Sequence, residues 1–258
     1  MSVGISTACF YPAPTEEALM SVAAAGAKVT EIFFNAPSEL EPGFLRRLSS
    51  AASDNGVSVR SIHPFTSFAE GYILFSRCER RFRDYREFYK RYYEAAAFLG
   101  AKIVVLHGSK LPLNISAEEY ADRLRLLVHD AAQRGIILAQ ENVVHYNGQS
   151  PELMRELKAR LGGDFHMVLD IKQSRRAGAD PIDFYREFSG DICHIHLSDH
   201  NRERDCIPPF EGEFDFRKLF GLMRSSGYGG DCVIELYRSG FETPKQLSRS
   251  LAKLETLT

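Results

Sequence analysis

A short β-branched segment, a polar loop and a helical segment follow one another eight times along this chain of 258 residues. Such alternation, without a block of strands alone, predicts an α/β fold with a parallel sheet. At this length it favours a closed (β/α)8 TIM barrel over an open doubly wound sheet, and no GxGxxG motif follows the first segment. The predicted strands are Val3–Cys9, Val29–Phe34, Val57–His63, Ile103–His107, Ile136–Asn142, His166–Asp170, Ile192–Ser198 and Cys232–Leu236.

The predicted helices lie between these strands, and glycines follow most of them, where a helix C-cap is expected. No linker or low-complexity tract divides the chain, so we expect a single domain over residues 1–258. Two connections are long, Pro64 to about Glu79 and Asp199 to about Phe214, and both are candidate substrate loops. The helices are expected near Thr15–Gly26, Gly43–Asn55, Arg80–Leu99, Ala117–Arg134, Pro151–Leu161, Pro181–Phe188, Asp215–Ser226 and Pro244–Thr256.

Charge and composition give no reason to expect a nucleic-acid or membrane partner. The formal net charge is -2, with 32 basic and 34 acidic residues, and no apolar run approaches the roughly 18 residues of a membrane span. The N-terminal segment lacks the basic and apolar regions of a signal peptide. The five cysteines form no CxxC pair, which favours a reducing compartment. We therefore expect a cytoplasmic protein.

Polar residues terminate six of the eight predicted strands, and each of them can bind a metal or move a proton. In a parallel barrel these strand ends meet at one rim. Alternation along the seventh strand should turn His194 and His196 into the barrel. The six residues are His63, His107, Glu141, Asp170, His196 and Glu235.

A divalent metal explains why three carboxylates would gather at this rim. One histidine or carboxylate at a strand end is usually structural, but carboxylates are rarely buried unless they are paired or bind an ion. Three of them together would repel one another strongly at neutral pH. A divalent cation removes that cost, so the sequence predicts a metal site at the carboxyl ends of the strands.

Four segments of the chain resemble the xylose-isomerase-like TIM-barrel superfamily, in its sugar phosphate isomerase/epimerase branch with the ketose 3-epimerases. They are ILAQENV (137–143), HMVLDIKQ (166–173), ICHIHLSDHNR (192–202) and CVIELY (232–237). The resemblance implies one divalent ion held by Glu141, Asp170, His196 and Glu235. It also implies a substrate contact for Arg202, which stands six residues after the metal histidine.

Gln173 departs from the family pattern, which commonly has histidine three residues after the metal aspartate. Glutamine can hydrogen-bond a substrate oxygen but cannot act as an acid. His63 and His107 also resemble the first-zinc histidines of zinc-dependent abasic-site endonucleases, which share this barrel. The third zinc of those enzymes lacks its ligands here, because Gln173 replaces one histidine and the loop after the seventh strand has no Asp-x-His. We expect both histidines to line the pocket or contact the substrate, and a two-metal site stays open.

An oxygen-rich set of three carboxylates and one imidazole suits Mn²⁺ first, with Mg²⁺, Co²⁺ or Zn²⁺ as alternatives. The resemblance implies an isomerase or epimerase that acts on a sugar or sugar phosphate through a metal-stabilised enediolate, with Glu141 and Glu235 as the proton carriers. One alternative is a dehydratase of the same superfamily, such as inosose or 3-dehydroshikimate dehydratase. Others are a metal-dependent phosphodiesterase and a non-catalytic carbohydrate-binding barrel. By analogy, homo-oligomers are common among such barrels.

Overall fold

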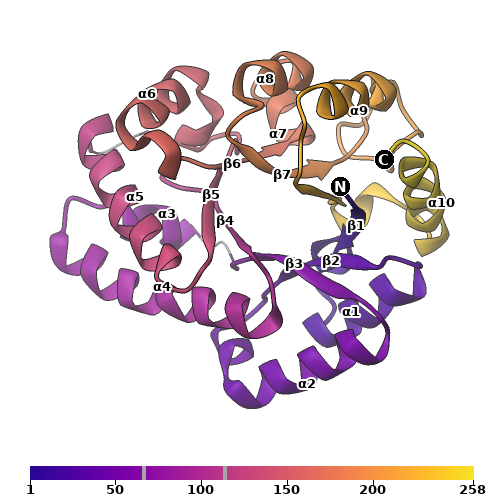
Figure 1. Ribbon diagram of the computed structural model, residues 1–258, viewed down its shortest axis with the longest axis horizontal. Helices are drawn as coiled ribbons and strands as arrows, with labels where there is room; N and C mark the ends of the chain where they lie inside the picture. The colour runs from indigo at the N-terminus through magenta and orange to yellow at the C-terminus, as the bar shows by residue number, and fades with distance from the viewer. Residues whose placement is uncertain (66–67, 113–114) are drawn as a thin grey trace.

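Eight parallel strands close into a barrel in the order of the sequence, with β1 paired to β8 (Figure 1). The computed structural model describes residues 1–65, 68–112 and 115–258. The predicted (β/α)8 fold is therefore confirmed. The strands are β1 Val3–Ser6, β2 Val29–Phe33, β3 Ser58–His63, β4 Ile103–Leu106, β5 Ile137–Glu141, β6 Met167–Asp170, β7 Ile192–Leu197 and β8 Asp231–Ile234.

Helices surround the barrel in a ring, because each crossover between parallel strands returns along the outside of the sheet (Figure 1). Within the described ranges, no helix is long and apolar enough to cross a membrane. The helices are α1 Thr15–Ala24, α2 Pro42–Asp54, α3 Phe68–Leu74, α4 Glu79–Leu99, α5 Ala117–Ala132, α6 Pro151–Leu161, α7 Ile171–Arg176, α8 Pro181–Phe188, α9 Phe216–Ser225 and α10 Pro244–Glu255.

Three of the differences from the predicted elements are larger than a shift of one or two residues at an end. The first strand was expected to reach Cys9, but β1 ends at Ser6, whose side chain accepts a hydrogen bond from the Ala8 amide and begins a 3₁₀ turn. The connection from Pro64 to Glu79 contains α3, and its residues 66–67 lie outside the described ranges. Helix α7 starts directly after β6, because the Asp170 carboxylate accepts a hydrogen bond from the Gln173 amide and caps it.

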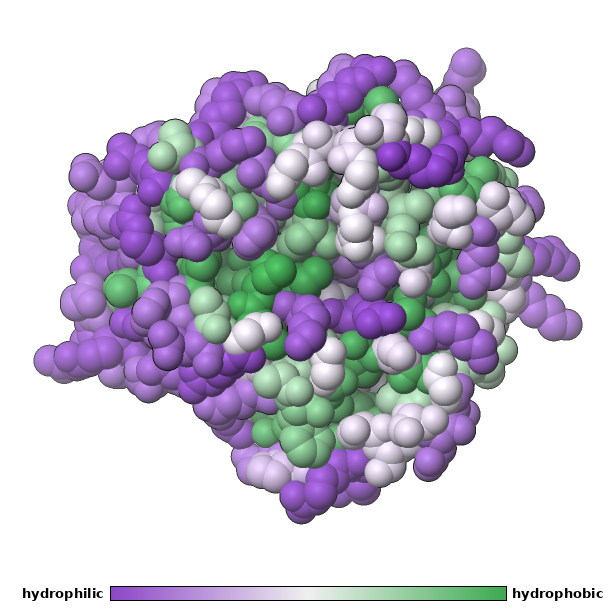
Figure 2. Space-filling view, in the orientation of Figure 1, coloured by the Kyte–Doolittle hydropathy of each residue, from purple (hydrophilic) through white to green (hydrophobic). Residues whose placement is uncertain are grey.

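The interior of the barrel has an apolar layer and a polar layer. Ile103, Val105, Ala139 and Val168 form the apolar cluster. His194 and His196 are fully buried and contact Glu31 of β2, which confirms that both point into the barrel. Figure 2 shows hydrophilic residues around the outer rim of the molecule and apolar residues toward the middle of the face in view.

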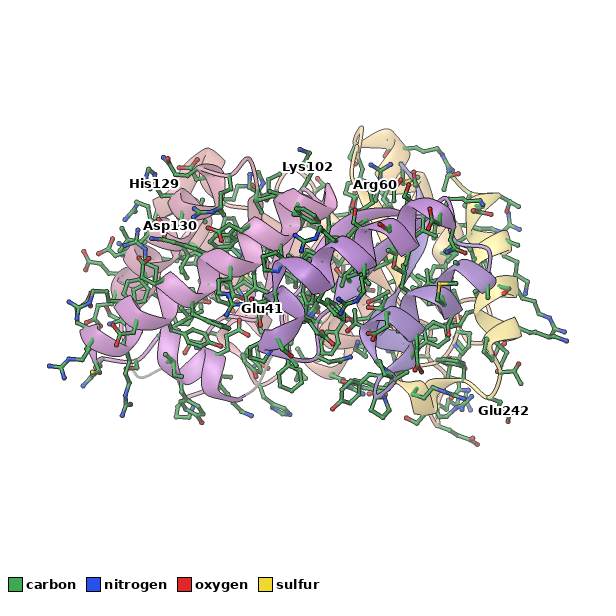
Figure 3. The ribbon with its side chains drawn as sticks, turned by 90° about the horizontal axis from the view of Figure 1, so that it is seen from below. Glu41, Arg60, Lys102, His129, Asp130 and Glu242 are labelled. Atoms are coloured by element: carbon green, nitrogen blue, oxygen red, sulfur yellow. The ribbon has the colours of Figure 1, made fainter. Side chains whose placement is uncertain are left out.

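The two ends of the barrel carry different residues. Arg60 in β3 and Lys102 just before β4 lie on one side of the molecule, and Glu242, which follows β8, lies on the opposite side (Figure 3). The second side is where the strands end and the connecting loops toward the helices begin. Active sites of such barrels form at this end.

The long connection after β7 is held together by Asp199. Its carboxylate accepts hydrogen bonds from the backbone amides of His200, Gly212 and Phe214, at 2.8–2.9 Å. Asp199 also forms an isolated antiparallel bridge with Ile207. One buried side chain therefore fixes both arms of a loop that starts three residues beyond a candidate metal ligand.

Candidate metal centre and pocket

Glu141, Asp170, His196 and Glu235 meet at the carboxyl ends of β5 to β8. One ligand atom from each lies within 4.8 Å of the ligand atoms of the other three. His196 Nδ1 is 3.3 Å from Glu141 Oε1, 3.5 Å from Glu235 Oε2 and 3.8 Å from Asp170 Oδ2. Ligand atoms placed tetrahedrally at about 2.1 Å from one ion would lie roughly 3.4 Å apart. The four side chains thus have the spacing of a single mononuclear site.

Two oxygen atoms of this cluster lack hydrogen bonds. Glu141 Oε2 and Asp170 Oδ2 are buried and accept none from any described residue, although His107 Nε2 and Lys172 Nζ each lie 2.9 Å from one of them. Buried carboxylate oxygens are normally hydrogen-bonded or bound to a cation. The donor set of three carboxylates and one imidazole, with two buried oxygens that accept no hydrogen bond and contact His107 and Lys172, therefore fits a divalent ion held by these four residues.

Lys172 points into the same cluster from the first turn of α7. Its ammonium donates a hydrogen bond to Glu235 Oε2 at 3.0 Å and lies 2.9 Å from Asp170 Oδ2. The side chain is 3% exposed. Burial alone would lower the pKa of Lys172, but the charges of Asp170 and Glu235 outweigh it and hold the pKa well above its usual range. The cluster therefore contains a charged ammonium that the sequence analysis did not assign.

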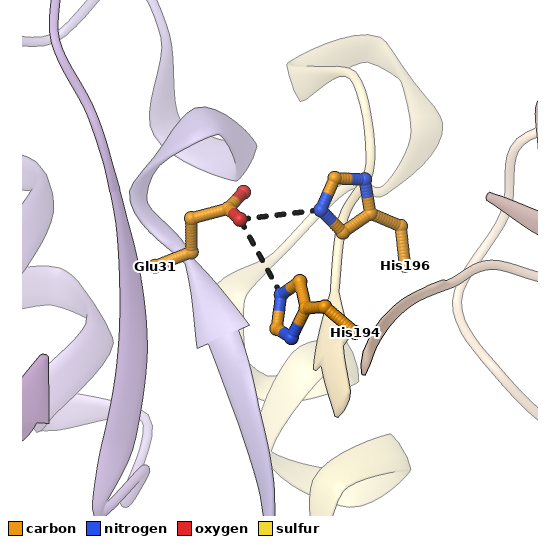
Figure 4. A group of neighbouring side chains, drawn as sticks. All are labelled: Glu31, His194 and His196. Carbon is orange, nitrogen blue, oxygen red and sulfur yellow. Dashed lines mark hydrogen bonds and ion pairs between the residues drawn. The ribbon is translucent and has the colours of Figure 1, made fainter. Parts of the chain in front are cut away.

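Glu31 of β2 lies beside His194 and His196 of β7 and contacts both rings (Figure 4). Its Oε2 atom lies 3.2 Å from His196 Nε2 and 3.4 Å from His194 Nε2, and it accepts a hydrogen bond from Ser61 at 2.8 Å. Burial would raise the pKa of Glu31, but the two histidines hold it well below its usual range. An ionised Glu31 favours the proton on His196 Nε2, which leaves Nδ1 free to bind a metal.

Replacing Glu31 with glutamine should weaken metal binding although Glu31 is not a predicted ligand. A neutral amide orients the His196 ring less strongly, and loss of such a supporting partner typically costs about 10- to 100-fold in metal affinity. Titration of the metal-free variant with Mn²⁺ by calorimetry measures this loss. An affinity equal to that of the wild type would show that Glu31 serves only the packing of the barrel interior.

His63 and His107 lie beside Glu141 at the rim. His107 Nε2 is 2.9 Å from Glu141 Oε2, and His63 Nε2 is 3.7 Å from the same oxygen and 3.1 Å from His107 Nε2. Burial would lower the pKa of His63, but the adjacent Glu141 carboxylate and the other carboxylates nearby raise it to about 9. His63, His107 and Glu141 also have ligand atoms within 4.8 Å of one another, so the geometry leaves a second metal position open.

The other two predicted substrate-binding residues, Gln173 and Arg202, differ in whether they line the pocket. Gln173 lines the pocket, and its side-chain carbonyl accepts a hydrogen bond from the Val144 amide at 3.2 Å. Arg202 is exposed, and it is not among the described residues that line the pocket. Arg176 of α7 does line it and forms an ion pair with Asp205. A substrate contact for Arg202 stays a prediction.

A pocket of about 940 Å³ opens above the cluster, which is within the size range of small-molecule sites. Among the four candidate ligands, Glu141 and Glu235 line this pocket, whereas Asp170 and His196 do not. Apolar and aromatic side chains form much of its wall, and two lysines and two arginines also reach it. The aromatic residues are Tyr11, Phe33, Phe65, Tyr146 and Tyr237, and the basic ones are Lys110, Lys172, Arg176 and Arg238.

Carboxylates and imidazoles lie at the ends of β5 to β8, and a pocket large enough for a small molecule opens above them. This arrangement is typical of (β/α)8 barrels whose site is built from strand ends and βα loops. The profile of one family of this class, the xylose isomerase-like TIM barrels, matches residues 19–257. The chain therefore belongs to this family.

Relatives in sequence are distant. An uncharacterised protein of Mycobacterium tuberculosis (strain ATCC 25618 / H37Rv) is 25% identical over 183 residues, which are 62% of this chain and 64% of that protein. The 3-dehydroshikimate dehydratase of Pseudomonas putida (strain KT2440) is 26% identical over 239 residues, 87% of this chain and 36% of the enzyme. The chain thus spans less than two thirds of the length of these relatives.

Solved structures share the fold over nearly the whole chain. The 3-keto-D-glucoside 4-epimerase of E. coli has a TM-score of 0.79 at 22% identity and covers 99% of both chains. An L-ribulose 3-epimerase has a TM-score of 0.81 at 17% identity, over 100% of this chain and 96% of that one. The probable 3-DHS dehydratase of Bacillus anthracis has a TM-score of 0.78 at 16% identity, over 99% of both chains. At these identities the likeness shows the fold alone.

Proposed function

We propose that this protein is a divalent-metal-dependent isomerase or epimerase that acts on a sugar or sugar phosphate, with Mn²⁺ as the preferred ion. The observation that carries the proposal is the division of the four residues: Glu141 and Glu235 line the pocket, and Asp170 and His196 do not. All four can hold an ion, but the two glutamates alone would also meet a substrate. Two carboxylates beside one bound carbon are what proton exchange on its two faces requires.

The protonation states support this assignment. Burial alone would raise the pKa of Glu141, but the charge of His107 and the contacts of the carboxylate with His107, His196 and His63 hold it well below its usual range. Glu141 is therefore ionised, as a base must be. When bound, a divalent ion supplies Lewis-acid stabilisation of the negative charge that develops on the substrate oxygens.

In the proposed reaction, a Glu141 oxygen takes the proton from the carbon next to the substrate carbonyl. The carboxyl group of Glu235 then delivers a proton to the opposite face of that carbon. Each glutamate resets its protonation by exchange with solvent through the pocket, so the net reaction inverts one stereocentre and consumes nothing. His107, 2.9 Å from Glu141 Oε2, is placed to pass the proton onward.

A dehydratase is the second candidate, and a specific observation favours it. Two curated relatives, from Pseudomonas putida and Pseudomonas aeruginosa, are 3-dehydroshikimate dehydratases that match 87% and 93% of this chain at 26% identity. Dehydration would use the same proton removal but would then expel a hydroxyl group as water. It creates a conjugated chromophore, and epimerisation does not.

Incubation in D₂O with Mn²⁺ and a panel of ketoses, aldoses and cyclic polyols tests the proposal. We expect one substrate class to gain deuterium at one carbon next to its carbonyl, as seen by NMR, without a change in ultraviolet absorbance. A rise in absorbance with loss of water would assign the protein to the dehydratases. Binding of a sugar without any deuterium incorporation would contradict both enzymatic candidates.

A further inference from the structure

Lys172 occupies an unusual place for a lysine. It is the second residue of α7, and Asp170, the residue that caps this helix, is also a proposed metal ligand. The cap fixes the direction of the first turn, and the Lys172 side chain runs from it into the mouth of the barrel. Its ammonium lies 2.9 Å from Asp170 Oδ2 and 3.0 Å from Glu235 Oε2.

These two oxygens are also the ones that face the common point of the four residues. Asp170 Oδ2 and Glu235 Oε2 lie 3.8 and 3.5 Å from His196 Nδ1, and Glu141 Oε1 lies 3.3 Å from the same nitrogen. An ion bound to them would share both with an ammonium that already contacts them. A divalent ion and an ammonium a few ångströms apart in a buried site repel strongly, so both cannot keep these contacts.

The pocket offers the Lys172 ammonium a second position, away from the two carboxylates. The Lys172 side chain lines the pocket, and its ammonium lies 5.0 Å from the centre of the Tyr237 ring, whose face attracts cations. A lysine has a flexible four-carbon stem and a compact charge. Rotation of the stem toward Tyr237 would move the ammonium off the carboxylates and into the substrate space.

We propose that Lys172 is a displaceable internal cation: it balances Asp170 and Glu235 in the metal-free protein, and metal entry moves its ammonium into the pocket, where it donates hydrogen bonds to a substrate oxygen. This inference rests on the metal site of the proposed function but not on the reaction. Metal binding and the formation of a cationic contact with the substrate are then coupled. Before the metal binds, the Lys172 ammonium neutralises the carboxylates and keeps their side chains apart.

Calorimetric titration of metal-free protein with Mn²⁺ at pH 8 tests the proposal. Lys172→Met removes the competing cation, so the variant should bind Mn²⁺ roughly ten- to hundredfold more tightly than the wild type. Lys172→Arg keeps the charge and should bind no more tightly than the wild type. Lys158→Met is the matched control, because Lys158 pairs with Asp191 on the surface, and its affinity should be unchanged.

Thermal unfolding gives a second readout. Without metal, Lys172→Met should melt below the wild type, because it leaves buried carboxylates uncompensated, and added Mn²⁺ should abolish or reverse that difference.

Equal or weaker Mn²⁺ binding by Lys172→Met, or a wild type that binds no Mn²⁺, would overturn the proposal. If the variant fails to fold, a Mn²⁺-bound crystal structure of the wild type decides: Lys172 Nζ within 3.2 Å of both carboxylates beside the ion would also overturn it. Absence of deuterium exchange with every sugar would instead count against the proposed function alone.

Discussion

Replacing Glu141 with glutamine is expected to slow solvent-proton exchange at the reacting carbon by about 10²- to 10⁴-fold, the usual cost of losing a general base. Glu141 lines the pocket and is held in its ionised form by His107 and His196. The amide of glutamine can still place an oxygen near an ion but cannot accept a proton. The rate of deuterium incorporation, measured at saturating metal and substrate, reports this loss.

Glu118→Gln is a suitable control, because Glu118 is an exposed glutamate in the first turn of α5, and its exchange rate should equal that of the wild type. Sugar binding by the Glu141 variant should change much less than exchange does. If binding and exchange fell by the same factor, Glu141 would only hold the metal, and the base would have to be sought elsewhere in the pocket.

Asp170→Asn should remove metal binding while it preserves the fold. One carboxylate oxygen caps α7 by accepting the Gln173 amide hydrogen bond, and the other faces the metal cluster. Asparagine is as good an N-cap as aspartate but a much poorer ligand for a hard cation. We expect Mn²⁺ affinity to fall by at least about 100-fold, which is the upper range for loss of a supporting partner of a ligand.

Thermal unfolding with and without Mn²⁺ shows the same effect, because an ion bound only by the native state raises the melting temperature. The wild type should gain stability on addition of Mn²⁺, and the Asp170 variant should not. Circular dichroism of the metal-free variant provides the folding control. A variant that kept both its fold and its Mn²⁺-dependent stabilisation would remove Asp170 from the ligand set.

The gathering of polar residues at one rim could be predicted from the sequence, because a parallel barrel brings the strand ends together independently of the loop conformations. His63, Glu141 and Asp170 each follow a short apolar run, so their place at the rim depended only on the register of alternating side chains. The resemblance to a known family supplied the choice of four ligands among the six residues. The structure places ligand atoms of these four around one point.

Glu31 was missed, although the sequence carries a signal for it. In Val29–Phe33, alternation puts Glu31 on the same face as Val29 and Phe33, and a carboxylate in the middle of an apolar strand needs a buried partner. That partner could not be named, because His196 is 165 residues away in the chain. Only closure of the barrel, which brings β2 and β7 to face each other across its interior, joins them.

The sequence analysis did not predict the direction of the Lys172 side chain or the presence of α3, and the reasons lie in the local sequence of each segment. Helix α7 has six residues, too few for a clear helical period, so the direction of Lys172 depends on the Asp170 cap and cannot be read from spacing. Helix α3 contains Gly71, which is unfavourable within a helix. Glycine is nevertheless needed there, because a Cβ atom would lie only 2.9 Å from the Gly108 carbonyl oxygen, in the loop that follows His107.

The central claim, one divalent ion held by these four residues, is tested most directly by anomalous diffraction from crystals soaked in Mn²⁺. The account predicts one strong anomalous peak with Glu141, Asp170, His196 Nδ1 and Glu235 each within roughly 2.5 Å of it. Lys172 should then have left its contacts with Asp170 and Glu235. The absence of a peak among these four side chains at saturating Mn²⁺, or a peak bound by other residues, would contradict it.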